Sequence, residues 1–396
     1  MEKIKPKFYS FSDDPYGFYH ANSHTMRFSH KVYWWVTDLL EPNFINLVDD
    51  LQTFTDDLKN KTAFLVVDDS ADPVTYNPLQ KTHLDSLFAY FDTHGIDKDR
   101  IIALTPSPTD KFFWTKYLPN YAKLTEPQTT KPYFKHLTHN RLIDEARWDL
   151  KLALESNRWH FPPSKPIKHF ICLSRRDSIN RQTVNTFIHS RKLFEKGIVT
   201  HQRIGEHNEK TDDQKRKVYL RVLSEHPSFN KKDFLKYGFM KHAALESDEL
   251  NKLEAIHSFQ LHLNYSSKAC FEIVTETDIS ANMIFLTEKV FKPMISKKLF
   301  FLAGNPNSLR FLRKCGFRTF SDIIDESYDS ELVFYTRISK MFDSIEELCK
   351  LSIPELQRKL EQIDDVLEHN YNHLLNTSWD FNLVKRIQQY IDEVNF

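Results

Sequence analysis

Glycine is scarce in this chain, at 7 of 396 residues. Many dinucleotide-binding domains cradle phosphates with a G-x-G-x-x-G turn, in which the glycines permit a tight bend and a close approach of the backbone. No such spacing of glycines occurs here. Any phosphate contacts must therefore come from helix N-termini and cationic side chains.

Cysteines are few and long apolar runs are absent. The four cysteines, Cys172, Cys270, Cys315 and Cys349, lie far apart, which predicts neither a disulfide framework nor a zinc site. The first residues contain no apolar core of a signal peptide, and no stretch approaches the ~18 consecutive apolar residues of a membrane span. We therefore expect a cytoplasmic protein without an integral membrane segment.

Net charge is zero, because 54 basic residues balance 54 acidic ones. A balanced chain has no overall electrostatic footprint for nucleic acid or for an anionic membrane. A local basic groove remains open, and the segments at 131–141 and 191–197 are its candidates. The hydrophobic content of 40% is ample for the cores of two domains.

Strand-like apolar runs alternate with helical spacings along the first part of the chain, a pattern typical of an α/β domain. A parallel sheet with helices on its faces follows from such alternation. The expected strands lie within residues 31–40, 63–72 and 100–108, and the expected helices within residues 42–58 and 82–96.

The proline-dense segment FPPSKP, residues 161–166, predicts a linker between two domains. Residues 1–160 then form an N-terminal α/β domain. Residues 167–350 form a second one, which opens with the strand-like HFICLS. Residues 351–396 follow a strongly helical pattern.

Residues 283–320 carry the most information about function. They predict a strand ending at Thr287, a helix, a strand closed by Gly304, a second helix and a final strand. This order places Glu288 and Lys289 at the mouth of the first helix, on the carboxyl edge of a parallel sheet. A helix N-terminus attracts anions, so Lys289 favours a phosphate site there, while Glu288 can accept hydrogen bonds from ribose hydroxyls.

The segment FEIVTETDISANMIFLTEKVFKP, residues 271–293, resembles the signature of the α-1,3-fucosyltransferase family, in which a Thr-Glu-Lys turn joins an apolar strand to an amphipathic helix. The region is also similar to glycosyltransferase-like proteins of phages and large viruses. Those proteins carry the same turn, a GF-TF segment and a following DESYD, which correspond here to residues 316–320 and 325–329. A second match, HFICLSRRDSINRQTV at 169–184, has an Arg-rich turn between a strand and a helix.

The resemblance implies the GT-B architecture, which has two Rossmann-like α/β domains and a C-terminal helix that crosses back to the first domain. Residues 379–396 are the candidate for that helix. The implied activity moves a sugar from a nucleotide-sugar donor, a co-substrate, to an acceptor hydroxyl, with no other cofactor. The donor would bind mainly to the second domain, and the first domain would present the acceptor.

The resemblance also assigns donor-binding residues to the two turns. In the family an arginine after the upstream strand binds the donor diphosphate, and a guanidinium suits phosphate because it donates two parallel hydrogen bonds. Solvated turn arginines and capped loop groups remain the alternative interpretation. The donor-binding candidates are Arg175, Arg176, Arg181, Glu272, Thr275, Glu276, Thr287, Glu288 and Lys289.

A transfer that inverts the anomeric centre needs a base to deprotonate the acceptor hydroxyl. Asp68 and Asp69 follow a strand-like run of the first domain, where a carboxylate would face a cleft, and Glu41 is another candidate. We expect no metal ion. The D-x-D spacing of Asp97 and Asp99 falls in a connecting turn, and DESYD is more typical of a helix cap or an acidic rim than of a cation site.

Three functions stay open at this point. We expect a saccharide acceptor, since the chain lacks the electrostatic footprint of a DNA-binding protein. A phage-type DNA glycosyltransferase that modifies hydroxymethylated bases is the alternative, and it would need a basic groove. A non-catalytic module that binds a nucleotide or a saccharide is the third possibility.

Overall fold

The computed structural model divides into two compact units. Unit 1 comprises Met1–Trp148 with Ser378–Phe396, and unit 2 comprises Asp149–Thr377. The helical stretch expected at 351–396 is thus shared between the units, and most of the expected linker at 161–166 lies outside the described residues. The residues that the structure describes are 7–9, 26–36, 45, 48–68, 86–87, 89–105, 135–138, 165–174, 178–201, 209–224, 226–238, 240, 263–277, 279, 284–376 and 379–395.

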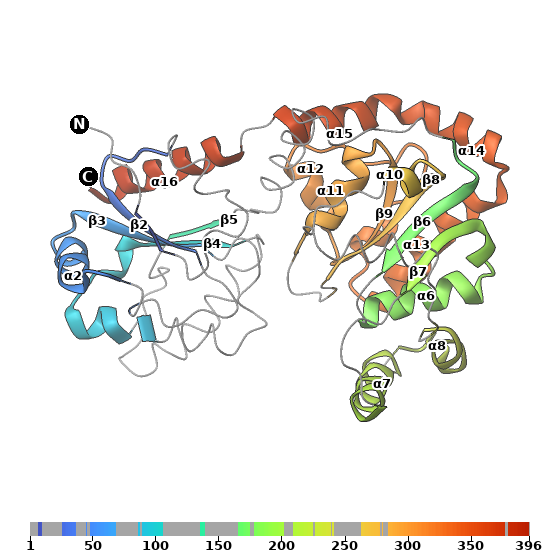
Figure 1. The fold of residues 1–396 in the computed structure, drawn as a ribbon, viewed down its shortest axis with the longest axis horizontal. Helices are drawn as coiled ribbons and strands as arrows, with labels where there is room; N and C mark the ends of the chain where they lie inside the picture. Colours follow the sequence, from blue (N-terminus) through green and yellow to red (C-terminus); the bar gives the residue numbers. More distant parts are fainter. Residues whose placement is uncertain are drawn as a thin grey trace. The chain divides into compact units, whose positions relative to one another are not determined.

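Every pair of neighbouring strands in the described part of the chain is parallel, which confirms the α/β class. Unit 1 has one sheet whose described strands lie in chain order (Figure 1). The strands are β1 (Lys7–Tyr9), β2 (Lys31–Val36), β3 (Ala63–Asp68), β4 (Ile101–Thr105) and β5 (Lys135–Thr138).

Side chains of this sheet alternate between two apolar clusters, as the two-residue period of a strand requires. On β2, Trp35 packs in one cluster with helix α2 (Leu51–Lys59), whereas Trp34 packs in the other with α16 (Trp379–Asn395). The residues that α16 contributes to this core are Leu383, Ile387 and Ile391.

Helix α16 covers the face of the sheet that the connecting helix α2 leaves open. Right-handed crossovers between strands in chain order place their helices on one face, so the opposite face needs another cover. Two hydrogen bonds add to the apolar contact: the amide of Ser29 donates to Gln388 Oε1 at 2.8 Å, and the hydroxyl of Tyr390 donates to the carbonyl of Asp99 at 2.9 Å. The end of the chain therefore completes unit 1.

Unit 2 has a four-stranded sheet in the order β7-β6-β8-β9 (Figure 1). Its strands are β6 (Lys168–Ser174), β7 (Gly197–His201), β8 (Ala269–Thr275) and β9 (Leu299–Ala303). The chain moves from β6 to β7 on one side and later from β8 to β9 on the other. The winding direction therefore reverses between β6 and β8, and in open parallel sheets ligands bind at the carboxyl end of such a switch point.

Helices flank both faces of this sheet. Helix α6 contacts α8 and α13, whereas α11 contacts α15, as expected for right-handed crossovers that leave the switch point in opposite directions. The α-helices are α6 (Ile179–Ser190), α7 (Glu209–Ser224), α8 (Lys231–Tyr237), α10 (Leu263–Ser266), α11 (Glu288–Ile295), α12 (Ser308–Lys314), α13 (Phe334–Lys350), α14 (Ile353–Leu360) and α15 (Asp364–Asn376). The short 3-10 helices of unit 2 are η4 (Phe194–Lys196), η5 (Ser327–Ser330) and η6 (Glu361–Ile363), whereas η3 (Lys98–Arg100) precedes β4 in unit 1.

Two strands expected around α11 and α12 are wrong. Residues 284–287 are buried but form no strand, and residues 317–320 form none either. In the first segment the backbone amides bond to side chains instead of to a neighbouring strand: the amide of Phe285 donates to Asn305 Oδ1, and that of Thr287 donates to Glu276 Oε1. An apolar run thus becomes a buried connection. No helix among the described residues is long and apolar enough to span a membrane.

Candidate functional site

The candidate site lies at the carboxyl edge of the sheet in unit 2, at the switch point. Ser174 ends β6 and Thr275 ends the neighbouring β8, and their hydroxyl oxygens lie 3.5 Å apart. Asn180, in the first turn of α6, donates from its side-chain amide to the carbonyl of Glu276. The exits of both strands and the start of α6 therefore meet at one place.

Helix α11 begins where the sequence predicts. Thr287 is its N-cap residue, with extended backbone and a side chain that accepts from the amide of Lys289. The amide of Thr287 donates to Glu276 Oε1 at 3.0 Å, and its hydroxyl donates to Glu276 Oε2 at 2.5 Å. Both oxygens of one carboxyl group thus fix the start of α11 to the end of β8.

Glu276 is fully buried behind this turn, with 0% of its surface exposed. Burial raises the pKa of its carboxyl group, and the opposing effects of Lys289 and of the hydrogen bonds from Thr287 do not cancel that rise. Gly304, just beyond β9, makes room for the side chain, because a Cβ atom there would lie 3.3 Å from Glu276 Cγ. Glu276 therefore positions Thr287.

Lys289 is held above the N-terminus of α11 by three oxygen atoms. Its Nζ lies 2.9 Å from Thr287 Oγ1, 3.3 Å from Thr277 Oγ1 and 2.9 Å from Glu288 Oε1. Its side chain remains 25% exposed, and Thr277 is exposed. An anion that enters here can replace the weaker contact to Thr277 and meet an ammonium group at the positive end of a helix dipole.

A second lysine, Lys292, helps to keep Glu288 negatively charged. Burial acts to raise the pKa of Glu288, but Lys289 and Lys292 outweigh it, so that the pKa lies below its ordinary value. Burial lowers the pKa of Lys292 itself. Lys292 follows Glu288 by four residues, the spacing at which helical side chains are neighbours. Lys292 was not among the residues predicted for the site, although that spacing is a signal visible in the sequence.

Arg337 of α13 supports the loops of the site from within the unit. Its guanidinium donates to the carbonyls of Gly304 and Ile279, each at 3.0 Å, and to that of Glu331 at 2.5 Å. It is 1% exposed, so its charge is offset by carbonyl oxygens from three segments. Nothing in the local sequence indicates this role.

The remaining donor candidates are placed differently. Arg181 lies in the first turn of α6 and is 9% exposed, close to the switch point. Glu272 lies in the middle of β8, opposite Phe300, where its carboxyl accepts from the hydroxyl of Ser266 at 2.6 Å and burial raises its pKa. Glu272 is therefore not part of the turn around Lys289. Arg175 and Arg176 lie outside the described residues.

The structure describes little of the predicted catalytic bases of unit 1, but it does describe the D-x-D turn. Asp68 is the last residue of β3, as expected, but its side chain is not among those described, and Asp69 and Glu41 lie outside the described residues. Asp97 forms an ion pair with Lys61 at 2.8 Å.

The DESYD segment supports neighbouring helices. Asp329 accepts from the amides of Leu309 and Arg310 at the start of α12, which makes it a helix cap. Glu326 accepts from the amide of Phe320 and the hydroxyl of Thr319. Within the described part of the chain, no three acidic, histidine or cysteine side chains gather as a metal site would require.

Comparisons with known proteins add no assignment. No protein-family model matches the chain, and a search among curated proteins finds no significant match. The function is therefore inferred from the geometry of the site.

Proposed function

We propose that the chain is a nucleotide-sugar-dependent glycosyltransferase of GT-B type, whose donor diphosphate binds at the carboxyl edge of unit 2. The observation that supports the proposal is the position of Lys289. It stands at the N-terminus of α11, beside the switch point of a parallel sheet, and is oriented by Thr287 and Glu288. Helix mouths at such switch points are common phosphate sites.

The chemistry follows from the charges around the turn. When the glycosidic bond to the donor breaks, negative charge develops on the departing diphosphate, and a fixed ammonium group stabilises it. Lys289 supplies that group, and Arg181 is a second cation near the same edge. Glu288 remains charged because its pKa is lowered, so it can accept hydrogen bonds from the ribose. These groups make a divalent cation unnecessary.

The acceptor hydroxyl would be presented by unit 1, with Asp68, Asp69 or Glu41 as the base. We propose a saccharide acceptor, because the chain carries no net charge and a duplex-binding surface would need several phosphate contacts. The alternative acceptor, to be tested against the saccharide, is hydroxymethylated DNA. Duplex retention that falls steeply with salt, together with sugar transfer to the duplex, would replace the saccharide proposal.

A thermal-shift screen of the full chain with GDP, UDP, CMP and dTDP tests the donor site. One nucleotide should raise the melting temperature, since a ligand at a hundredfold its dissociation constant adds ~2.7 kcal/mol of stability. Lys289→Ala should abolish most of that shift. Lys314→Ala, an exposed lysine at the other end of a neighbouring helix, is the matched control and should retain it. No shift with any nucleotide would refute the donor site.

A further inference from the structure

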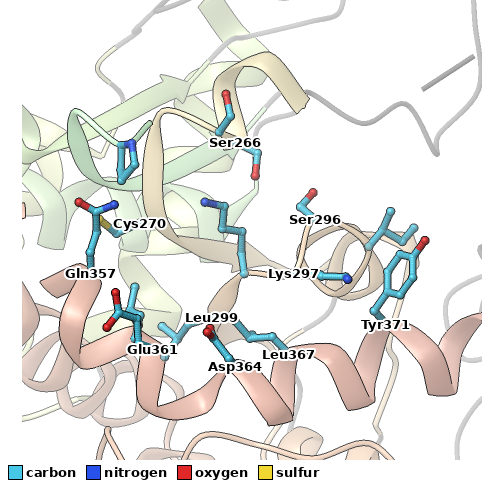
Figure 2. A pocket seen from close by; sticks show the side chains of 15 residues that line it. Ser266, Cys270, Ser296, Lys297, Leu299, Gln357, Glu361, Asp364, Leu367 and Tyr371 are labelled. Atoms are coloured by element: carbon cyan, nitrogen blue, oxygen red, sulfur yellow. The ribbon is translucent and has the colours of Figure 1, made fainter. Parts of the chain in front are cut away.

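A cavity of about 580 Å³ lies at the amino edge of the sheet in unit 2. It is bounded by the start of β8, by the end of α11 with the start of β9, and by the stretch from α14 to α15 (Figure 2). Helix α11 begins at the proposed donor site and ends here, so the cavity is a separate place in the fold. Its volume is within the roughly 300–1,000 Å³ of ligand-binding pockets.

Part of the lining is apolar. Hydrocarbon side chains from parts of unit 2 that lie far apart in the sequence form it, and a ligand with a nonpolar face can pack against them. These residues are Pro166, Ile295, Leu299, Leu360 and Leu367.

Polar side chains, several of them exposed to solvent, border the same space. Figure 2 shows Glu361 and Asp364 on the helical wall, with Ser296 across from them. Within the described part of the chain, neither carboxylate has a hydrogen-bond or ion-pair partner, and the same holds for the side chains of Ser296 and Gln357. The cavity thus offers acceptors and donors together.

The charges of the lining cancel. Glu361 and Asp364 are balanced by Lys297 and Lys298, of which Lys297 is also paired with Glu368. The carbonyl end of α11 points to this edge, because the helix ends at Ser296, and its partial negative charge disfavours an anion. A cation would meet two ammonium groups as well as the two carboxylates, so neither sign of charge is favoured by the lining side chains alone. The lining therefore suits an uncharged ligand.

We propose that this cavity binds a short neutral saccharide. Sugar hydroxyls can donate to the two carboxylates and accept from Lys298 or the amide of Gln357, as the donors and acceptors of the lining require. The C–H face of a sugar ring can pack on the apolar residues. The proposal does not depend on the proposed donor site, because the cavity lies at the opposite edge of the sheet.

Saturation-transfer NMR on the full chain, with lactose, maltose and cellobiose as probes, tests the proposal. At least one probe should bind. Asp364→Asn and Glu361→Gln should each weaken that binding by about tenfold, or ~1.4 kcal/mol, since each removes a charged hydrogen-bond acceptor. Asp365→Asn is the matched control. Asp365 is the next residue, pairs with Arg318 at 2.8 Å and does not line the cavity, so its substitution should leave binding unchanged.

The possible outcomes separate this site from the donor site. Saccharide binding that survives in Lys289→Ala but weakens in Asp364→Asn supports the cavity, whatever the nucleotide screen finds. Ser296→Phe, which adds a large side chain to the lining of the cavity, should abolish binding in a folded protein. The proposal is overturned if no probe binds, or if binding is equal in Asp364→Asn and Asp365→Asn. It is also overturned if spermidine or free glycine, rather than a saccharide, binds in a manner sensitive to Asp364.

Discussion

Replacing Thr287 with valine removes one hydroxyl group and keeps the shape of the side chain. That hydroxyl donates to Glu276 Oε2 at 2.5 Å and accepts from Lys289 Nζ at 2.9 Å. The variant therefore leaves a buried carboxyl group without one donor, at a cost of ~1.5–3 kcal/mol, and removes a helix N-cap, at a cost of about 1 kcal/mol. We expect unit 2 to lose about 2 to 4 kcal/mol of stability.

The cysteines provide an assay for unit 2 alone. All four lie within that unit, three of them buried, and unit 1 contains none. A thiol reagent then reaches the three buried cysteines, Cys172, Cys270 and Cys349, only as unit 2 opens. Their labelling rate follows the opening equilibrium when reclosing is fast. At ~1.4 kcal/mol per tenfold change, Thr287→Val should accelerate labelling roughly 30- to 700-fold.

Thr287→Ser is the matched control, because it keeps the hydroxyl and loses only a methyl group. It should label at close to the rate of the unmodified protein. Equal labelling rates in the unmodified protein and Thr287→Val would refute the role of the Thr287–Glu276 hydrogen bonds. Equally fast labelling of both variants would show instead that the methyl group carries the stability.

Further predictions concern the same turn. Lys289→Ala should weaken nucleoside diphosphate binding by ~1.5–3 kcal/mol in a folded protein, measured by calorimetry beside Lys314→Ala; unchanged affinity would contradict the assignment. Sugar transfer should survive EDTA. Loss of turnover that manganese restores would instead make Asp97 and Asp99 the candidate metal ligands. Burial raises the pKa of Glu276, so the folded chain binds this proton more tightly than the unfolded chain. Its stabilising contribution is complete below the ordinary pKa of 4.5 and is lost as pH rises through the folded value. Between pH 4.5 and the folded pKa, the thiol-labelling rate of Glu276→Gln should therefore vary less with pH than that of the unmodified protein. An unaltered pH profile would exclude Glu276 as the cause.

The start of α11 was predictable because its signals are local. An N-cap threonine, two charged residues and apolar residues at helical spacing all lie within residues 287–295. The strand after it was predictable for the same reason, since LFFLA is a short, continuous apolar run. Such elements need no information from the rest of the chain.

Features that depend on distant partners could not be predicted. The run at 284–287 looks like a strand, but its amides bond to Asn305 and Glu276, which lie 20 and 11 residues away. Arg337 donates hydrogen bonds to the carbonyls of Gly304 and Ile279, which lie 33 and 58 residues before it in the sequence. A periodic pattern shows only which face of a segment is buried. It does not show which distant side chain will accept the backbone hydrogen bonds that a neighbouring strand would otherwise accept.

The direction of the helices explains why the two edges of unit 2 suit different ligands. In a parallel sheet each crossover helix begins at the carboxyl edge and ends at the amino edge, so positive helix ends gather at one edge and negative ends at the other. Helix α11 follows this rule, from its N-cap at Thr287 to its C-cap at Ser296. Lys289 adds a full positive charge to the first end. At the other end the carboxylates of Glu361 and Asp364 are matched by Lys297 and Lys298. If the proposed donor site is correct, a diphosphate would be stabilised at the carboxyl edge, whereas a ligand at the amino edge would need hydrogen-bonding groups but no charge.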